Sequence, residues 1–204
     1  MTAILALDTA TGPCSVAVWK DGCVVAYLET LRPASQSACL VPMIEQALKE
    51  SRLEYQDFSA VAATVGPGSF TGIRVGLAAA AGIAFSSPIN RLGFTTLETL
   101  AFGARQQAGR ILAILNAGKN EVYYQLFEAG PWRALSEPAL GPLEQAMTLA
   151  DKALVVGNAL PDAPPTYPRA DALAQLTATH AAKALSLSPF YIRPPDAKLP
   201  SQKA

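Results

Sequence analysis

Histidine is almost absent from this chain. His180 is the single histidine among 204 residues. The sequence therefore lacks a pair of histidines at positions i and i+4 of one helix, an arrangement that can hold zinc or iron. The candidate nucleophiles Ser15, Cys39 and Ser69 likewise have no histidine nearby in the sequence to act as a base. We expect no metal site, no cofactor and no catalytic residue, and we interpret His180 as a helix-face residue.

Charge is also sparse. Charged residues make up 16% of the chain, and 16 basic residues balance 16 acidic ones. This balance gives no overall attraction to nucleic acid or to a membrane surface. Hydrophobic residues make up 50%, which is enough for a substantial core. Low charge with high hydrophobicity also indicates that a partner covers part of the surface.

Features of secreted and membrane proteins are missing too. The three cysteines, Cys14, Cys23 and Cys39, are odd in number and form no CxxC pair. A reducing compartment is the simplest interpretation. Residues 1–7 carry no basic residue, so we expect no secretory signal. The weakly polar stretch at 75–89 is short and alanine-rich for a membrane span. We predict a cytoplasmic protein without membrane association.

The predicted elements repeat along the chain. Apolar runs and turn residues predict, in the first half, strands at 3–7, 15–19, 23–30, 60–65 and 90–94 and helices at 35–51, 72–86 and 95–107. The second half is expected to hold strands at 110–118, 121–128, 132–136 and 153–156 and helices at 143–151 and 170–187. Each half follows the order βββαβα. We predict an α/β fold with two lobes, residues 1–108 and 109–204, built from a duplicated unit.

Two prolines qualify this pattern. Pro42 should either kink the helix at 35–51 or mark its first turn. The tail from Pro189 is expected to be extended, to pack back on the protein and to fray at 201–204.

A glycine-rich segment, residues 66–74, follows the strand predicted at 60–65. Its sequence is Gly66-Pro67-Gly68-Ser69-Phe70-Thr71-Gly72-Ile73-Arg74, and we call it the glycine loop. Three glycines and a proline specify a defined turn, and Thr71 can cap the next helix. The spacing GxGxxxG matches neither GxxxxGK[ST] nor GxGxxG. A shaped loop that starts a closely packed helix is therefore preferred over an anion site.

The helix after this loop carries small residues at a regular interval. Gly72, Gly76, Ala80 and Ala84 recur every four residues, which predicts a smooth stripe that another helix can approach closely. The preceding helix is rich in apolar residues, so two helices from each of two chains could form a four-helix interface. Burial by helices of the same chain is the alternative. The predicted partner interface comprises Leu40, Val41, Ile44, Leu48, Gly72, Arg74, Gly76 and Ala80.

Several motifs together resemble one family. They are Leu5 to Thr11 with Cys14 to Ala17, Leu40 to Ile44, Gly66 to Arg74, Thr95 to Glu98, Asn116 to Tyr123, and Tyr191 to Arg193. The chain resembles the bacterial TsaB (YeaZ) family of tRNA threonylcarbamoyladenosine biosynthesis proteins, within the actin-like ATPase (ASKHA, ribonuclease H-like) superfamily. The glycine loop is the specific motif, and the C-terminal half matches more loosely.

The resemblance implies a non-catalytic accessory subunit. Such a subunit binds the catalytic subunit TsaD and, with the ATPase TsaE, supports formation of N6-threonylcarbamoyladenosine (t6A37) in tRNA. The family also forms homodimers through its first two helices. Contact with tRNA itself is expected to be indirect or weak.

Actin-like ATPases hold phosphates between two hairpin turns, which correspond here to Asp8 with Thr9 and to Asn116. Asp8 could orient a magnesium-bound water, but capping of its own turn is the preferred interpretation. Asn116 is neutral, and Gly157-Asn158 keeps one of two expected glycines. Gln36 stands where the family often has a histidine. ATP hydrolysis is therefore not expected, and the alternatives are an actin-like ATP-binding enzyme that uses Asp8 and a metallopeptidase-like hydrolase.

Overall fold

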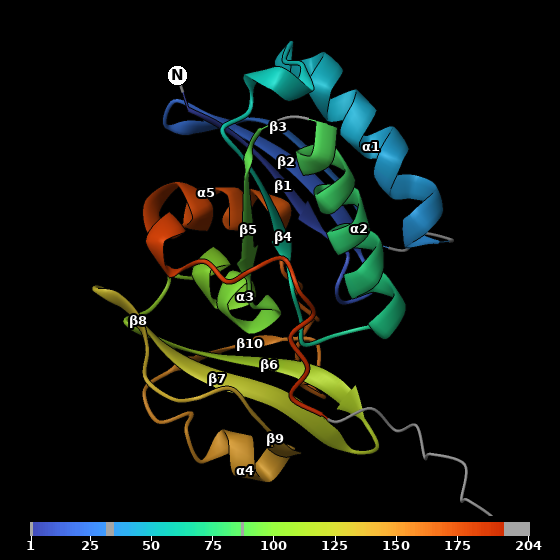
Figure 1. Cartoon of the computed structure of the whole chain (residues 1–204). Coiled ribbons are helices and arrows are strands. Elements are labelled where there is room, and N and C mark those ends of the chain that lie inside the picture. Colours follow the sequence, from blue (N-terminus) through green and yellow to red (C-terminus); the bar gives the residue numbers. More distant parts are fainter. Residues whose placement is uncertain (1, 32–34, 87, 194–204) are drawn as a thin grey trace, which may run out of the picture.

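The protein folds around two β-sheets (Figure 1). The structure is a computed structural model that describes residues 2–31, 35–86 and 88–193. The first sheet has the strand order β3-β2-β1-β4-β5. Its strands are β1 (Ala3–Asp8), β2 (Cys14–Lys20), β3 (Cys23–Thr30), β4 (Ala60–Thr64) and β5 (Asn90–Phe94).

The second sheet has the order β10-β6-β7-β8, and a further strand, β9, also pairs with β7. Its strands are β6 (Arg110–Gly118), β7 (Glu121–Ala129), β8 (Trp132–Ala134), β9 (Ala139–Pro142) and β10 (Leu154–Gly157). The described α-helices are α1 (Gln36–Ser51), α2 (Phe70–Ser86), α3 (Thr96–Gly103), α4 (Leu143–Met147) and α5 (Ala170–His180). Two short 3-10 turns lie at Tyr55–Asp57 and Ala181–Lys183.

Helices and sheets alternate in layers. Helices α1 and α2 cover one face of the first sheet, and α3 and α5 lie between the two sheets (Figure 1). Helix α4 covers the outer face of the second sheet. Each interface is filled by apolar side chains, so three hydrophobic clusters stack through the molecule.

Strand β1 lies at the centre of the first sheet and is buried along its whole length. Leu5 and Leu7 pack toward α1 and α2, whereas Ile4 and Ala6 pack toward α3 and α5. A strand covered on both faces needs apolar residues at every position, which explains its continuous apolar run. The strand predicted at 3–7 is therefore confirmed.

The α/β fold with a repeated βββαβα unit is confirmed, although β5 and α3 follow the first copy and the second copy contains the additional strand β9. The division into lobes at 108/109 stays a prediction, because α5 crosses back and packs on β1 and β2 of the first sheet. The amide of Ala170 donates to Ser15 Oγ at 3.0 Å, which joins the start of α5 to β2.

Several element boundaries differ from the prediction. Pro42 lies inside α1 and does not mark its first turn. Helix α4 ends at Met147, and α5 ends at His180, where a 3-10 turn replaces the expected continuation. Strand β9 was not predicted, because its four residues include a glycine and a proline.

The C-terminal segment packs back on the protein, as predicted, through Arg193. Leu185 exchanges backbone hydrogen bonds with Gly93 of β5, at 2.7 and 2.8 Å. Phe190 N then donates to Val65 O at 2.7 Å, and Arg193 Nη1 donates to Ala117 O at 3.2 Å. The segment thus runs from the first sheet to the second (Figure 1). The fraying predicted at 201–204 lies outside the described residues.

Candidate functional site

The first residues of the first hairpin turn, at the end of β1, are buried. Asp8, Thr9 and Ala10 are all buried. Oδ1 of Asp8 accepts hydrogen bonds from Thr64 Oγ1 at 2.6 Å and from the amide of Ala10 at 3.5 Å. Oδ2 has no hydrogen-bond partner among the described residues. The contact with Ala10 is the turn-capping contact expected of Asp8.

Burial controls the ionisation of Asp8. Desolvation raises the pKa of its carboxyl group to about 7, and the hydrogen bond from Thr64 offsets only part of this rise. Burying a neutral, protonated carboxyl group costs less free energy than burying a carboxylate. The protonated form is therefore favoured here, where Oδ2 is buried without a hydrogen-bond partner among the described residues. Asp8 therefore stabilises its turn and does not present a free carboxylate to solvent.

A cleft of about 450 Å³ separates the two hairpin turns. We call it the hairpin cleft. Its described lining residues carry no charged side chain; they are Ala10, Thr11, Gly12, Gln36, Gly68, Ser69, Leu115, Asn116, Ala117, Tyr123 and Asn158. Phosphoryl transfer depends on charged groups and metal ions that offset the phosphate charge. Among its described lining residues the cleft offers neither arginine, lysine nor carboxylate.

Neutral amides organise the second turn. Asn116 is exposed, and its Oδ1 accepts a hydrogen bond from Gly118 N at 2.7 Å. The amide of Asn116 donates to Asn158 Oδ1 at 2.8 Å. Across the cleft, Gln36 Nε2 donates to Gly12 O at 3.0 Å. Asn116, Asn158 and Gln36 all line this cleft, and each is hydrogen-bonded to the chain's own backbone.

The glycine loop packs directly on the first hairpin turn. A Cβ on Gly68 would lie 2.2 Å from Ala10 O, and one on Gly72 would lie 2.1 Å from Thr9 O. The amide of Ser69 donates to Ala10 O at 2.7 Å, and Thr9 Oγ1 donates to Gly72 O at 2.7 Å. The glycines are thus needed for close backbone approach, as expected of a shaped loop that starts a closely packed helix.

The residue that caps α2 differs from the prediction. Ser69, not Thr71, caps α2: its hydroxyl oxygen accepts a hydrogen bond from Gly72 N at 3.2 Å. Pro67 is buried between these glycines. The loop is also held from the other side, since a Cβ on Gly66 would lie 2.5 Å from Phe190 O of the C-terminal segment.

Five of the eight predicted interface residues are buried within this chain and offer no surface to a partner, while the interface itself stays a prediction. Leu40, Ile44, Gly72, Gly76 and Ala80 are buried within this chain. The stripe of small residues faces the first hairpin turn, where a Cβ on Gly76 would lie 2.6 Å from Thr9 Oγ1. The every-fourth-residue spacing correctly indicated a close approach. Its partner is the chain's own turn, which sequence spacing alone does not reveal.

The opposite side of α2 is exposed and apolar. We define the exposed α2 face as Phe70, Arg74, Ala78, Ala81 and Phe85, which follow one another at helical spacing. Phe70 is 57% exposed and Phe85 is 95% exposed. Of the predicted interface residues, Arg74 lies on this face, Val41 is exposed on the neighbouring α1, and Leu48 is half-buried.

Aromatic contacts order the start of this face. The Arg74 guanidinium lies 3.8 Å from the centre of the Phe70 ring. Tyr191 of the C-terminal segment stacks on Phe70 with ring centres 6.1 Å apart. Its hydroxyl oxygen accepts a hydrogen bond from Arg74 Nε at 3.5 Å. The late Tyr191 motif and the glycine loop, distant in sequence, thus meet at one surface.

His180, the single histidine, lies apart from the hairpin cleft and from the exposed α2 face. His180 ends α5, and its Nδ1 lies 2.7 Å from Thr179 Oγ1. Among residues 2–31, 35–86 and 88–193, no three His, Cys, Asp or Glu side chains are grouped as metal ligands. Within the same described part of the chain, no helix has the length and apolar character needed to cross a membrane.

Each of the two sheets begins with an antiparallel hairpin, helices lie between the sheets, and a cleft separates the two hairpin turns. This arrangement defines the actin-like, ribonuclease H-like class of α/β proteins. The structure is similar to YeaZ from Pseudomonas aeruginosa, with a TM-score of 0.78 and 25% identity over 94% of this chain and all of that one. It is also similar to an uncharacterized protein with similarity to peptidase YeaZ from Pseudomonas aeruginosa, with a TM-score of 0.84 and 27% identity over 95% of this chain.

Sequence comparisons identify the family. Residues 34–182 match the family model described as TsaD, tRNA N6-adenosine threonylcarbamoyltransferase. The Haemophilus influenzae tRNA threonylcarbamoyladenosine biosynthesis protein TsaB is 31% identical over 93% of each chain. The Escherichia coli protein of the same name is 43% identical over 63% of this chain, and that match spans 58% of the relative's length. The chain belongs to the TsaB (YeaZ) family, as its motifs predict.

Proposed function

We propose that this protein is a non-catalytic subunit of the machinery that makes N6-threonylcarbamoyladenosine (t6A37) in tRNA. Its relatives carry the name tRNA threonylcarbamoyladenosine biosynthesis protein TsaB. In this proposal the chain binds a TsaD-type threonylcarbamoyltransferase, works with TsaE, and forms a homodimer when alone. Its contact with tRNA is indirect or weak, in keeping with 16 basic and 16 acidic residues.

The observation that carries the proposal is the exposed α2 face. Phe85 is 95% exposed and Phe70 is 57% exposed, with Ala78 and Ala81 between them. Small residues between two large aromatic ones allow another helix to approach closely and place an aromatic anchor at each end. Apolar surface of this kind on a folded protein is typical of an interaction site.

The hairpin cleft supports the proposal of an accessory role rather than catalysis. Asp8, the candidate for an ATP-dependent step, is buried and does not line the cleft. The described lining residues are neutral, so the site holds no group to balance a triphosphate. Neither the actin-like ATPase nor the metallopeptidase-like alternative receives support from a named residue.

Association can be tested with a single charge on the exposed α2 face. Phe85→Glu should weaken both self-association and binding to TsaD by at least about tenfold, because a carboxylate would have to be desolvated in the interface. Met147→Glu is the matched control, since Met147 is 41% exposed on α4 at the other end of the molecule. Sedimentation velocity with and without TsaD measures both associations.

Reconstituted tRNA modification with TsaD and TsaE should fall in parallel with binding. Equal association of Phe85→Glu and wild type would remove the exposed α2 face from the proposal. Loss of modification by Asp8→Asn with unchanged TsaD binding would instead favour the ATPase alternative. Substitutions at Gly76 or Ala80 would test folding rather than association, since both residues are buried.

A further inference from the structure

A second concave site lies away from the hairpin cleft. It is a cavity of about 290 Å³ between α3, α5, β10 and the loop before α5, and we call it the inter-helix cavity. Leu100, Ala104 and Val156 form an apolar wall, while Arg105, Arg169 and Asp171 bring charge to it. It shares no lining residue with the hairpin cleft. Nothing in the proposed function uses it.

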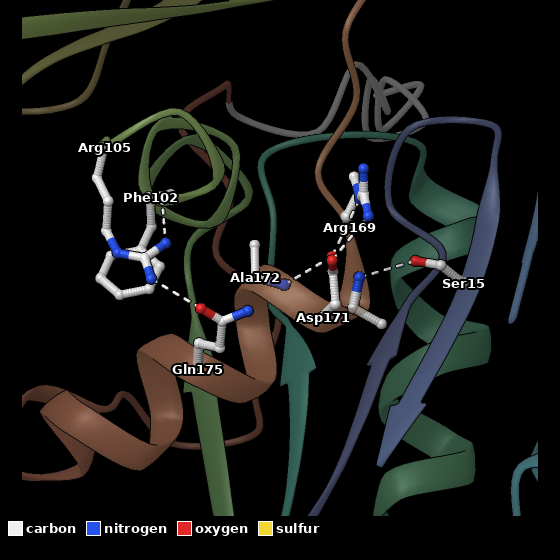
Figure 2. A network of polar contacts seen from close by, with 8 residues as sticks. Ser15, Phe102, Arg105, Arg169, Asp171, Ala172 and Gln175 are labelled. Atoms are coloured by element: carbon white, nitrogen blue, oxygen red, sulfur yellow. Dashed lines mark hydrogen bonds and ion pairs between the residues drawn. The ribbon is translucent and has the colours of Figure 1, made fainter. Parts of the chain in front are cut away.

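One of its two arginines is neutralised within the protein. Arg169 donates from Nε to Asp171 Oδ1 at 3.0 Å and from Nη2 to Oδ2 at 2.7 Å. Asp171 Oδ1 also accepts from the amide of Ala172 at 2.8 Å (Figure 2). The acceptors of Asp171 are thus occupied by its own helix and by Arg169. This pair contributes no net charge to the cavity.

The other arginine is held in place by neutral groups. Arg105 donates from Nη1 to Phe102 O at 2.9 Å and from Nη2 to Gln175 Oε1 at 2.7 Å. Its guanidinium lies 3.9 Å from the centre of the Phe102 ring. Figure 2 shows Arg105 and Gln175 on one side of the first turns of α5, with Arg169 and Asp171 on the other.

Arg105 therefore brings one positive charge in excess, because Asp171, the carboxylate that acts on it through space, is already paired with Arg169. None of the ion pairs found among the described residues includes Arg105. Burial lowers the pKa of its guanidinium from the ordinary value, which leaves it charged at neutral pH while its hydration is reduced. A partly desolvated cation that is fixed by two hydrogen bonds is preorganised to bind an anion.

We propose that the inter-helix cavity binds a small organic carboxylate with an apolar body. The carboxylate pairs with Arg105, and the body packs on Leu100 and Val156. One unbalanced arginine matches one negative charge, whereas a phosphate monoester carries about −1.5 to −2 at neutral pH. At about 290 Å³ the cavity lies at the lower limit of ligand pockets, so it suits a small acid better than a nucleotide.

The test compares probes that differ only in charge. The full chain, labelled with ¹⁵N, is titrated with sodium benzoate, with benzamide and with inorganic phosphate while the Arg105 Nε–H resonance is followed. Benzoate should shift this resonance saturably. Benzamide, which has the same shape without the charge, should bind at least about tenfold more weakly, because charge-assisted hydrogen bonds are the stronger class.

Variants locate the binding site. Arg105→Gln should lower benzoate affinity by at least about tenfold, and Arg105→Lys should retain part of it. Arg91→Gln is the matched control, because Arg91 is exposed on β5 and does not line the cavity. Equal affinity for benzoate and benzamide, tighter binding of phosphate, or unchanged affinity in Arg105→Gln would each overturn the proposal. If Arg105→Gln fails to fold, the benzoate and benzamide titrations of the wild type decide it.

Discussion

The two hairpin turns occupy equivalent places in the duplicated unit but have different surroundings. The first turn, Asp8 to Ala10, is buried beneath the glycine loop. The second turn, at Asn116 to Asn120, is mostly exposed. In the first repeat, the loop and α2 fill the space beside the turn. The same backbone topology thus supports a packed structural element in one half and an open polar turn in the other.

The closest contact of the first turn should give the largest effect. Gly72→Ala places a Cβ 2.1 Å from Thr9 O, so either the turn or α2 must move. We expect the free energy of unfolding to fall by at least about 3 kcal/mol, at the upper end of overpacking effects. Urea unfolding measures it.

Gly82→Ala on the same helix is the control. An added Cβ there meets no atom within 4 Å, so we expect a stabilisation of about 0.5–1 kcal/mol from the lost glycine entropy. Similar destabilisation by both substitutions would show that contact with the first turn is not what requires Gly72.

Ionisation of Asp8 gives the next largest effect. The pKa of its carboxyl is raised from 3.8 to about 7 by burial, so between these values the folded chain holds a proton that the unfolded chain has released. Stability should therefore fall as pH rises through this window, by about 2 kcal/mol between pH 5 and pH 7. Urea unfolding at both pH values measures this slope, which Asp8→Asn should remove. An identical slope in Asp8→Asn would assign it to other groups.

Thr9→Val tests the hydrogen bond between the first turn and α2. The substitution keeps the side-chain shape but removes the Oγ1 donor to Gly72 O, a buried contact of 2.7 Å. We expect a loss of about 1.5 kcal/mol, since the carbonyl remains buried without its donor. Thermal unfolding followed by circular dichroism is sufficient, and Thr9→Ser, which retains a hydroxyl, should be milder.

The second turn should be the most tolerant. Asn116→Ala removes a hydrogen bond from Gly118 N at an exposed position, so water can replace it. We expect a change of about 0.5 kcal/mol or less in the free energy of unfolding. A loss as large as that of Thr9→Val would mean that both turns are equally structural, and the contrast between the two halves would disappear.

Much of the fold could be predicted from local patterns. The continuous apolar run of β1 and the turn at Asp21 and Gly22 both follow rules that act over a few residues. Thr95 is a threonine directly before a helix, a position where capping is common, and its hydroxyl oxygen accepts a hydrogen bond from Glu98 N at 3.0 Å. The ends of α4 and α5 were not predicted; turns with i→i+3 hydrogen bonds follow Met147, and a 3-10 turn follows His180.

The candidate site was predicted less completely. The sequence indicated the two hairpin turns, at Asp8 and Asn116, and a cleft does lie between these turns, but Asp8 itself is buried and does not line it. The sequence did not reveal the contact between Phe70 and Tyr191, which joins segments far apart in the chain. Nor did it indicate the pairing of Arg105 with Gln175, because no local motif marks either residue.

Sequence by itself determined the duplicated unit, the closely packed glycine loop and the family, since these depend on periodicity, on glycine spacing and on a specific motif. Only the tertiary structure decided which side of α2 is buried. Helix α2 is apolar nearly all round, so its pattern does not distinguish the side that meets the sheet from the side that meets solvent. The side of α2 that carries Gly72 packs on the first hairpin turn, because only glycine at position 72 leaves room for the carbonyl oxygen of Thr9.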